Sequence, residues 1–148
     1  FPPRVPAFAP AQPAPAITFS KLTTIYVGPG VSNFQSDPTF TATAFSCSNV
    51  SGQTASLRLL ILSNAGGLVG NITQSLAHGA NVTISTENID FLGDIPVSTG
   101  NVNEGTVNIE STQSGVFCTA MMIKPTATVP SGITLHLVRL NPHPGTVE

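Results

Sequence analysis

The sequence predicts an all-β protein: an antiparallel β-sandwich or jelly-roll-like domain of about eight strands, with an extended, Pro-rich N-terminal arm. Short apolar runs recur along the chain, separated by turn-forming residues at intervals of roughly 8 to 12 residues, as in sandwich and barrel folds. No segment shows the sustained 3.6-residue apolar period of a helix. Six of the first 16 residues are proline. We therefore divide the chain into an arm, residues 1–16, and a single β-sandwich domain, residues 17–148.

The composition limits the classes of function. The chain has 148 residues, of which 41% are hydrophobic and 8% are charged, whereas a typical soluble domain carries about 25% charged residues. The formal net charge is −2 and the five Lys and Arg residues are not clustered, which argues against nucleic acid as a partner. No apolar stretch reaches the roughly 18 residues of a membrane-spanning helix, so no membrane span is expected.

The arm reads FPPRVPAFAPAQPAPA. Proline has no amide donor and a fixed φ, so this segment is predicted to be neither a helix nor a central strand. An extended conformation close to polyproline II is expected instead. Phe1, Val5 and Phe8 are the apolar side chains that can anchor such an arm on a protein surface.

Turn signals delimit the first strands of the domain. Residues 17–27 are followed by Gly-Pro-Gly at 28–30, which is expected to end the first strand. The Asn-Ala-Gly-Gly sequence at 64–67 is expected to form a hairpin, because Asn and Gly tolerate positive φ. The strands joined by this hairpin are expected at 54–63 and 68–76.

The rest of the domain follows the same pattern of short strands. Residues 87–105 are its least regular part, because Gly93, Pro96 and Gly100 interrupt any element there. The remaining strands are expected at 40–48, 81–86, 106–112, 115–123 and 132–140.

Two of these strands are apolar on both faces, namely residues 57–62 and residues 116–123. A two-layer sandwich covers only one face of a strand from within, so the other face needs a cover of its own. That cover is either a loop or the arm of the same chain, or another subunit, and the sequence favours neither. In the last strand, Ile133, Leu135 and Leu137 share one face.

Cys47 and Cys118 both lie in apolar, strand-like runs. The sequence begins at Phe1 rather than at Met, which leads us to expect a processed protein, extracellular or at the cell surface after removal of a signal peptide. An even pair of cysteines in an exported protein usually forms a disulfide. We therefore predict a Cys47–Cys118 disulfide between two core strands, with two buried free thiols as the alternative.

Residues able to carry chemistry are scattered along the chain. His78, His136 and His143 have no metal-ligand or catalytic spacing, and no nucleophile-elbow motif is present. We therefore expect no enzyme activity, no metal and no cofactor. The carboxylates, which match neither a calcium loop nor an identifiable glycosidase pair, are Asp37, Glu87, Asp90, Asp94, Glu104, Glu110 and Glu148.

Three Asn-x-Ser/Thr sequons mark candidate glycosylation sites, at Asn49, Asn71 and Asn81. They matter only in an organism that glycosylates such sequons. Glycans there would keep a surface with so few charges hydrated.

Four segments, 21–31, 45–61, 115–123 and 135–146, resemble small exported bacterial proteins of unknown function. The shared features are a TTIYV strand, a Cys-x-Asn segment, a Cys-Thr-Ala segment and a Leu-His-x-x-Arg-x-Asn-Pro tail. The resemblance covers most of the domain but not the arm. It implies an exported domain with two cysteines, and it implies no activity.

The favoured function is an extracellular structural subunit that self-assembles into a filament, fibre or surface layer. Its arm is expected to dock on a neighbouring subunit, in a groove involving residues 54–63 or 115–123. The alternative is a monomeric exported binding module for a glycan or surface ligand, with a site built from loops 28–38 and 87–105. A hydrolase is the third hypothesis. The expected partner is a second copy of the chain, with glycans as candidates.

Overall fold

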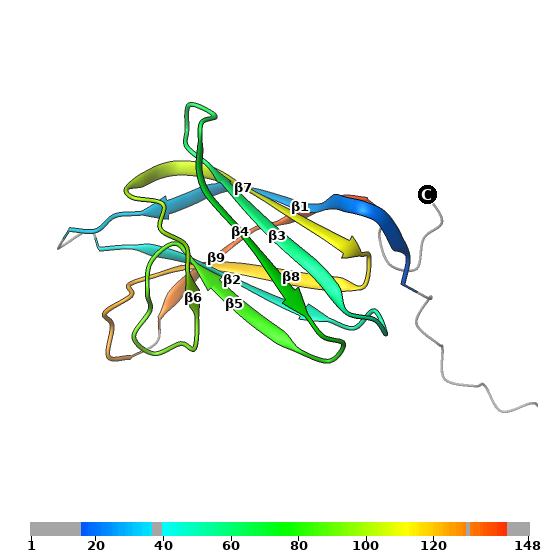
Figure 1. Ribbon diagram of the computed structural model, residues 1–148. Helices are drawn as coiled ribbons and strands as arrows, with labels where there is room; N and C mark the ends of the chain where they lie inside the picture. The colour runs from blue at the N-terminus through cyan, green and yellow to red at the C-terminus, as the bar shows by residue number, and fades with distance from the viewer. Residues whose placement is uncertain (1–15, 37–39, 130, 142–148) are drawn as a thin grey trace, which may run out of the picture.

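The computed structural model describes residues 16–36, 40–129 and 131–141. Over these residues the chain forms ten strands in two five-stranded sheets that face each other (Figure 1). The predicted β-sandwich is therefore confirmed, with ten strands instead of about eight. In chain order the strands are β1 (Thr18–Asn33), β2 (Ala42–Asn49), β3 (Ala55–Leu62), β4 (Leu68–Leu76), β5 (Asn81–Ser85), β6 (Ile95–Pro96), β7 (Val102–Gln113), β8 (Val116–Ile123), β9 (Gly132–Leu135) and β10 (Val138–Arg139).

The chain passes repeatedly from one sheet to the other. The first sheet has the order β10-β1-β7-β3-β4, and the second sheet has the order β6-β5-β2-β8-β9. Two connections, β3–β4 and β8–β9, join antiparallel neighbours within a sheet. The pairings between the strands are antiparallel, except that β5 and β6 run parallel.

The prediction that Gly-Pro-Gly ends the first strand is wrong. β1 continues through these residues to Asn33 and pairs with β7 on both sides of Pro29. A register shift follows Pro29, and Gly30 has a φ of 88°. Glycine adopts this left-handed conformation without a Cβ clash. The β-bulge at Gly30 therefore accommodates the proline, and β1 continues beyond it.

The expected strand at 132–140 is divided between the two sheets. β9 pairs with β8 in the second sheet, and β10 pairs with β1 in the first. Of the three residues expected on one face, Leu135 and Leu137 are half-buried against the core, whereas Ile133 is 70% exposed. Ile133 lies on β9, which is at the edge of the second sheet.

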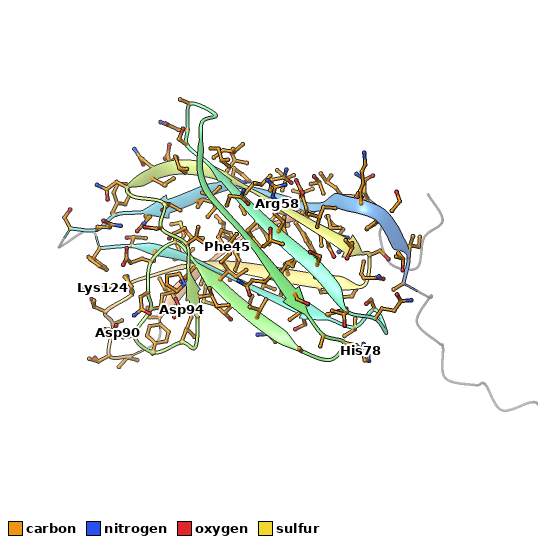
Figure 2. All side chains as sticks on the ribbon, viewed as in Figure 1. Phe45, Arg58, His78, Asp90, Asp94 and Lys124 are labelled. Carbon is orange, nitrogen blue, oxygen red and sulfur yellow. A yellow bond between two sulfur atoms is a disulfide. The ribbon has the colours of Figure 1, made fainter. Side chains whose placement is uncertain are left out.

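The core lies between the sheets and follows the period-two alternation of the strands. Inward side chains of β3 and β7, such as Leu59 and Ile109, are fully buried, and Phe45 lies between the layers (Figure 2). Cys47 and Cys118 lie directly opposite each other on β2 and β8 and form a disulfide. The predicted pairing is therefore confirmed, and it joins neighbouring strands within the second sheet.

Two buried asparagines tie the sheets together at opposite ends of the sandwich. Asn33, at the end of β1, donates from Nδ2 to the carbonyl oxygens of Thr86 at 3.0 Å and Gly100 at 2.9 Å. Asn49, at the end of β2, donates to the carbonyl oxygen of Leu76 at 2.8 Å. Each of these side chains, which starts from a strand of one sheet, thus bonds to backbone that ends or follows a strand of the other sheet or a loop beside it.

Arg139 closes the side of the sandwich between β1 and β8. Its Nη1 donates to the carbonyl oxygen of Val116 at 2.6 Å, and its Nη2 donates to that of Ser114 at 2.5 Å. The guanidinium carbon lies 5.0 Å from the centre of the Tyr26 ring and 5.8 Å from that of Phe117. The arginine of the C-terminal tail motif therefore has a structural role.

We expect reduction of the disulfide to lower the free energy of unfolding by roughly 4 kcal/mol, because the chain it closes spans 71 residues. The measurement is guanidinium unfolding with and without reductant. A Cys47→Ala/Cys118→Ala variant should unfold at the same guanidinium concentration as the reduced wild-type protein, and adding reductant should not change its unfolding midpoint. Two free thiols in native material, seen by mass spectrometry, would contradict the prediction.

Replacing Arg139 by Ala should lower the free energy of unfolding by about 2 kcal/mol, because two charge-assisted hydrogen bonds are lost. Arg139→Lys should recover less than half of this loss, since an ammonium group cannot reproduce the two-pronged geometry. Denaturant unfolding of both variants checks the prediction. A stability of Arg139→Ala equal to that of the wild type would show that the contacts carry no net energy.

Candidate assembly surface

The outer face of the second sheet presents a flat array of uncharged side chains. The strand registers align its outward residues in four rows across β5, β2, β8 and β9, and no row contains a charged residue. In order the rows are Asn81–Ser48–Phe117, Thr83–Ser46–Thr119, Ser85–Ala44–Met121–Thr134 and Ala42–Ile123–Gly132.

The loop at residues 86–94 covers one half of this face. Ile89 is 1% exposed and packs, with Phe91 and Leu92, on the alanines of β2 and on Ile123. Asp94 holds the loop, because its carboxylate accepts hydrogen bonds from the Ser85 hydroxyl and from the Ile89 amide (Figure 2). A loop of the same chain therefore covers part of β8.

The other half of the face is not covered by this loop, and the Arg139 guanidinium borders it, 5.8 Å from the centre of the Phe117 ring. Phe117 is 46% exposed and Met121 is 42% exposed. Beside Met121, at the border of the covering loop, lies a mostly apolar groove of about 110 Å³. Its lining residues are Ala44, Ser46, Thr83, Leu92, Thr119, Ala120 and Met121.

The polar side chains of the open half bond to one another. Asn81 Oδ1 accepts hydrogen bonds from Ser48 Oγ at 2.9 Å and from Ser46 Oγ at 3.3 Å. The Ser46 and Thr83 hydroxyls lie 3.4 Å apart. Because these groups already have partners, burying the face against another protein leaves fewer of them unsatisfied.

The other two-faced strand, β3, is more fully enclosed. Leu60 and Leu62 on its outer side are half-buried, and Arg58 beside them donates from Nε to Asn71 Oδ1 at 3.1 Å. β3 lies between β7 and β4, and β8 lies between β2 and β9. Neither strand therefore has a free edge, and only an outer face of either can meet a partner.

The three sequons differ in accessibility. Asn71 and Asn81 are exposed. Asn49 is fully buried, and its Nδ2 donates to the carbonyl oxygens of Gln53 and Leu76. A glycan on Nδ2 does not fit this packing, so the expectation of a glycosylation site at Asn49 is wrong for the folded protein.

The structure does not gather the candidate catalytic residues. His78 accepts a hydrogen bond from the Gly52 amide at 3.0 Å, and His136 is exposed on the β9–β10 connection. Glu110 lies opposite Arg58 on the outer face of the first sheet. Within the described ranges, no three His, Cys, Asp or Glu side chains lie close enough to hold a metal ion. His143, Asp37 and Glu148 lie outside the described residues.

The loops expected to form a ligand site do meet at one end of the sandwich. Gln35 donates from Nε2 to the Glu87 carboxylate at 2.9 Å, and its amide donates to Asn101 Oδ1 at 3.3 Å. These polar groups bond to one another across the two loops. Residues 37–39 of this end lie outside the described residues.

The arm anchors Phe1, Val5 and Phe8 lie outside the described residues. The covering loop was not predicted from the sequence, because Gly93, Pro96 and Gly100 make residues 87–105 look only irregular. The available signal was the apolar group Ile89, Phe91 and Leu92, which is unusual in a solvated loop.

In the part of the chain that the structure describes, no helix is long and apolar enough to cross a membrane. Neither a protein-family model nor a curated protein sequence matches this chain. The crystal structure of Thermotoga maritima 1070 is similar to it, with 14% sequence identity and a TM-score of 0.48. That likeness covers 82% of this chain and 93% of the Thermotoga chain.

Replacing Phe117 and Met121 together by Thr should change the free energy of unfolding of the monomer by about 1 kcal/mol or less, because both side chains are surface-exposed. Ile123→Ala, on the same strand face but under the loop, should lower it by about 3 kcal/mol. Urea unfolding of both variants makes the comparison. Equal losses would mean that the open half is part of the folded core.

Proposed function

We propose that this protein is an extracellular structural subunit that self-assembles into a filament, fibre or surface layer. We further propose that its N-terminal arm docks on a neighbouring subunit. The observation that carries the proposal is the open half of the outer face of the second sheet, around Phe117 and Met121.

This half-face has the properties of an interface core. Two large apolar side chains are exposed among uncharged residues whose polar groups already bond to one another. The charged group beside Phe117, the Arg139 guanidinium, donates to the carbonyl oxygens of Val116 and Ser114. Interface cores are depleted in charge, and aromatic residues and methionine are enriched there. A second copy of this chain is a suitable occupant, because its 12 charged residues in 148 produce little repulsion.

The extracellular location is supported by the disulfide between Cys47 and Cys118. Structural disulfides persist in oxidising compartments and are rare in the cytosol. The low content of charged side chains also suits a protein whose surface is largely buried in an assembly.

Glycosylation and assembly exclude each other at Asn81. This residue lies in the same row as Phe117, and it is exposed on the open half. A glycan there would cover the proposed interface. Asn71, on β4 of the other sheet, carries no such conflict with this face.

The wild-type protein at neutral pH is expected to form concentration-dependent assemblies in sedimentation velocity and regular particles in electron microscopy. The Phe117→Thr/Met121→Thr variant should associate at least tenfold more weakly, because the interface loses both apolar anchors. Uniform wild-type monomers at high protein concentration would contradict the proposed function.

A control variant replaces two other exposed apolar side chains by the same residue, Thr. Val50 and Val129 are 56% and 72% exposed and do not belong to the four rows. The Val50→Thr/Val129→Thr variant should associate like the wild type. If it loses association as strongly as the Phe117/Met121 variant, the effect is general hydrophobicity and not this face.

The monomeric binding module remains the second candidate, because the loops around Gln35 and Asn101 meet at one end of the sandwich. It predicts binding on a glycan array by a protein that sediments as a monomer. A Gln35→Ala variant should then lose glycan binding without a change in sedimentation.

A further inference from the structure

We infer that residues 5–11 of one subunit add as a sixth, antiparallel strand to the free edge of β4 in a neighbouring subunit. This inference rests on the proposed function and names the receiving site of the arm. The site belongs to the first sheet, and it differs from the open face of the second sheet.

β4 is the one long terminal strand of the two sheets over the described residues. It has nine residues, whereas β9, β6 and β10 at the other three margins have four, two and two. Proteins that stay monomeric blunt exposed edges with short strands, proline or charges. β4 has neither proline nor a charged residue, so its edge is open to another strand.

The neighbouring hydrogen bonds show which groups of β4 face this edge. The Ser63 amide donates to the carbonyl oxygen of Gly67, toward β4, and the Ser56 amide donates to Thr112 on β7. By alternation, the odd residues of β3 bond to β4 at Gly70, Ile72 and Gln74. The amides and carbonyls on the free edge therefore belong to the residues between and after these, Asn71, Thr73 and Ser75.

A groove follows the same edge. It has a volume of about 450 Å³ and runs between residues 68–72 of β4 and the segment 96–98. Val97 in that segment is part of the core, and Ile72 is half-buried against it. The groove therefore offers an apolar seat next to an unpaired strand edge, which is the combination that strand addition uses.

The arm has one intact hydrogen-bonding edge over residues 5–11. Successive amides of a strand point to opposite sides, and Val5, Ala7, Ala9 and Ala11 all keep their amide hydrogens. The prolines of this segment, at 6 and 10, fall on the opposite side. Such a segment can form backbone hydrogen bonds on one side only. It can therefore become the edge strand of a sheet, and no further strand can pair with it.

One register allows the arm to form backbone hydrogen bonds with β4 and also places an apolar side chain in the groove. When Ala9 lies opposite Asn71, Ala7 lies opposite Thr73, and the intact edge of the arm faces the free edge of β4. Phe8 then lies beside Ile72 on the inner side of the strand, at the groove. The side chains of Ala7 and Ala9 then point to solvent, and the Phe8 side chain fills the apolar groove.

An arm in this orientation must come from another subunit. Thr18 pairs with Gln113 at the Leu76 end of the first sheet, far from the 63–67 hairpin (Figure 1). In the antiparallel register, residue 11 lies near the Leu68 end of β4, whereas β1 starts at the Leu76 end. The added strand is also four strands away from β1 across the sheet, so residue 11 is about 30 Å from the start of β1. The seven steps from residue 11 to residue 18 span at most about 25 Å.

This contact joins two different surfaces and is therefore heterologous, so it propagates from subunit to subunit unless it closes into a ring. The open face around Phe117 can then connect neighbouring rows of subunits. The two contacts together account for an extended assembly.

Cysteine cross-linking of the full-length chain tests the register. An Ala9→Cys protein is mixed with an Asn71→Cys protein or, as the matched control, with a Ser75→Cys protein, and the mixtures are oxidised. Asn71 and Ser75 are both exposed on β4 and lie about 14 Å apart along it. We expect at least fivefold more intermolecular disulfide with Asn71→Cys, and Phe8→Ser in the arm should reduce this yield about tenfold. Peptide mapping confirms that Cys47–Cys118 stays intact.

Each other outcome overturns the inference. Equal yields with the two partners indicate unspecific contact, and a higher yield with Ser75→Cys indicates a parallel arm. Absence of cross-links while the wild type still assembles in sedimentation velocity means that the arm docks elsewhere, and the proposed function then stands. A wild type that stays monomeric at all concentrations removes both proposals.

Discussion

The direct pairing of Cys47 with Cys118 is the constraint on which the rest of the second sheet depends. A covalent bond between opposite residues fixes the register of β2 and β8, and a strand slipped by one residue would exchange its two faces. With this register Phe45 points into the core, while Phe117 and Met121 point outward. The exposed apolar side chains are thus held in place by the same bond that stabilises the domain.

The low number of charged residues makes the surfaces of this protein suitable for association with another protein. A face of hydroxyls and amides that bond to one another carries neither the repulsion nor the hydration of a charged surface. β4 adds an unblocked edge, and the arm adds a segment that can bond on one side only. Each feature alone is a liability for a monomer, and together they suit a protein whose stable form is an assembly.

Much of the fold could be predicted from local patterns, and the exceptions have identifiable causes. The hairpin at 64–67 and the alternating strand at 106–112 follow from positive-φ residues and period-two burial. The expected turn at 28–30 failed because a β-bulge can absorb a proline when Gly30 follows it. The expectation at Asn49 failed because a sequon does not show whether its side-chain amide forms buried hydrogen bonds, as it does here with the Leu76 carbonyl oxygen.

The sequence by itself determined the strand-rich character of the chain, the two cysteines as the candidate disulfide pair and the spacing of the prolines in the arm, because each depends on residues close in the chain or unique in it. Only the tertiary structure decided that β4 lies at a margin, that the loop around Ile89 covers half of β8 and that Arg139 closes the sandwich. These are contacts between distant segments. Their partners are set by the order of strands in the sheets, and no local pattern encodes that order.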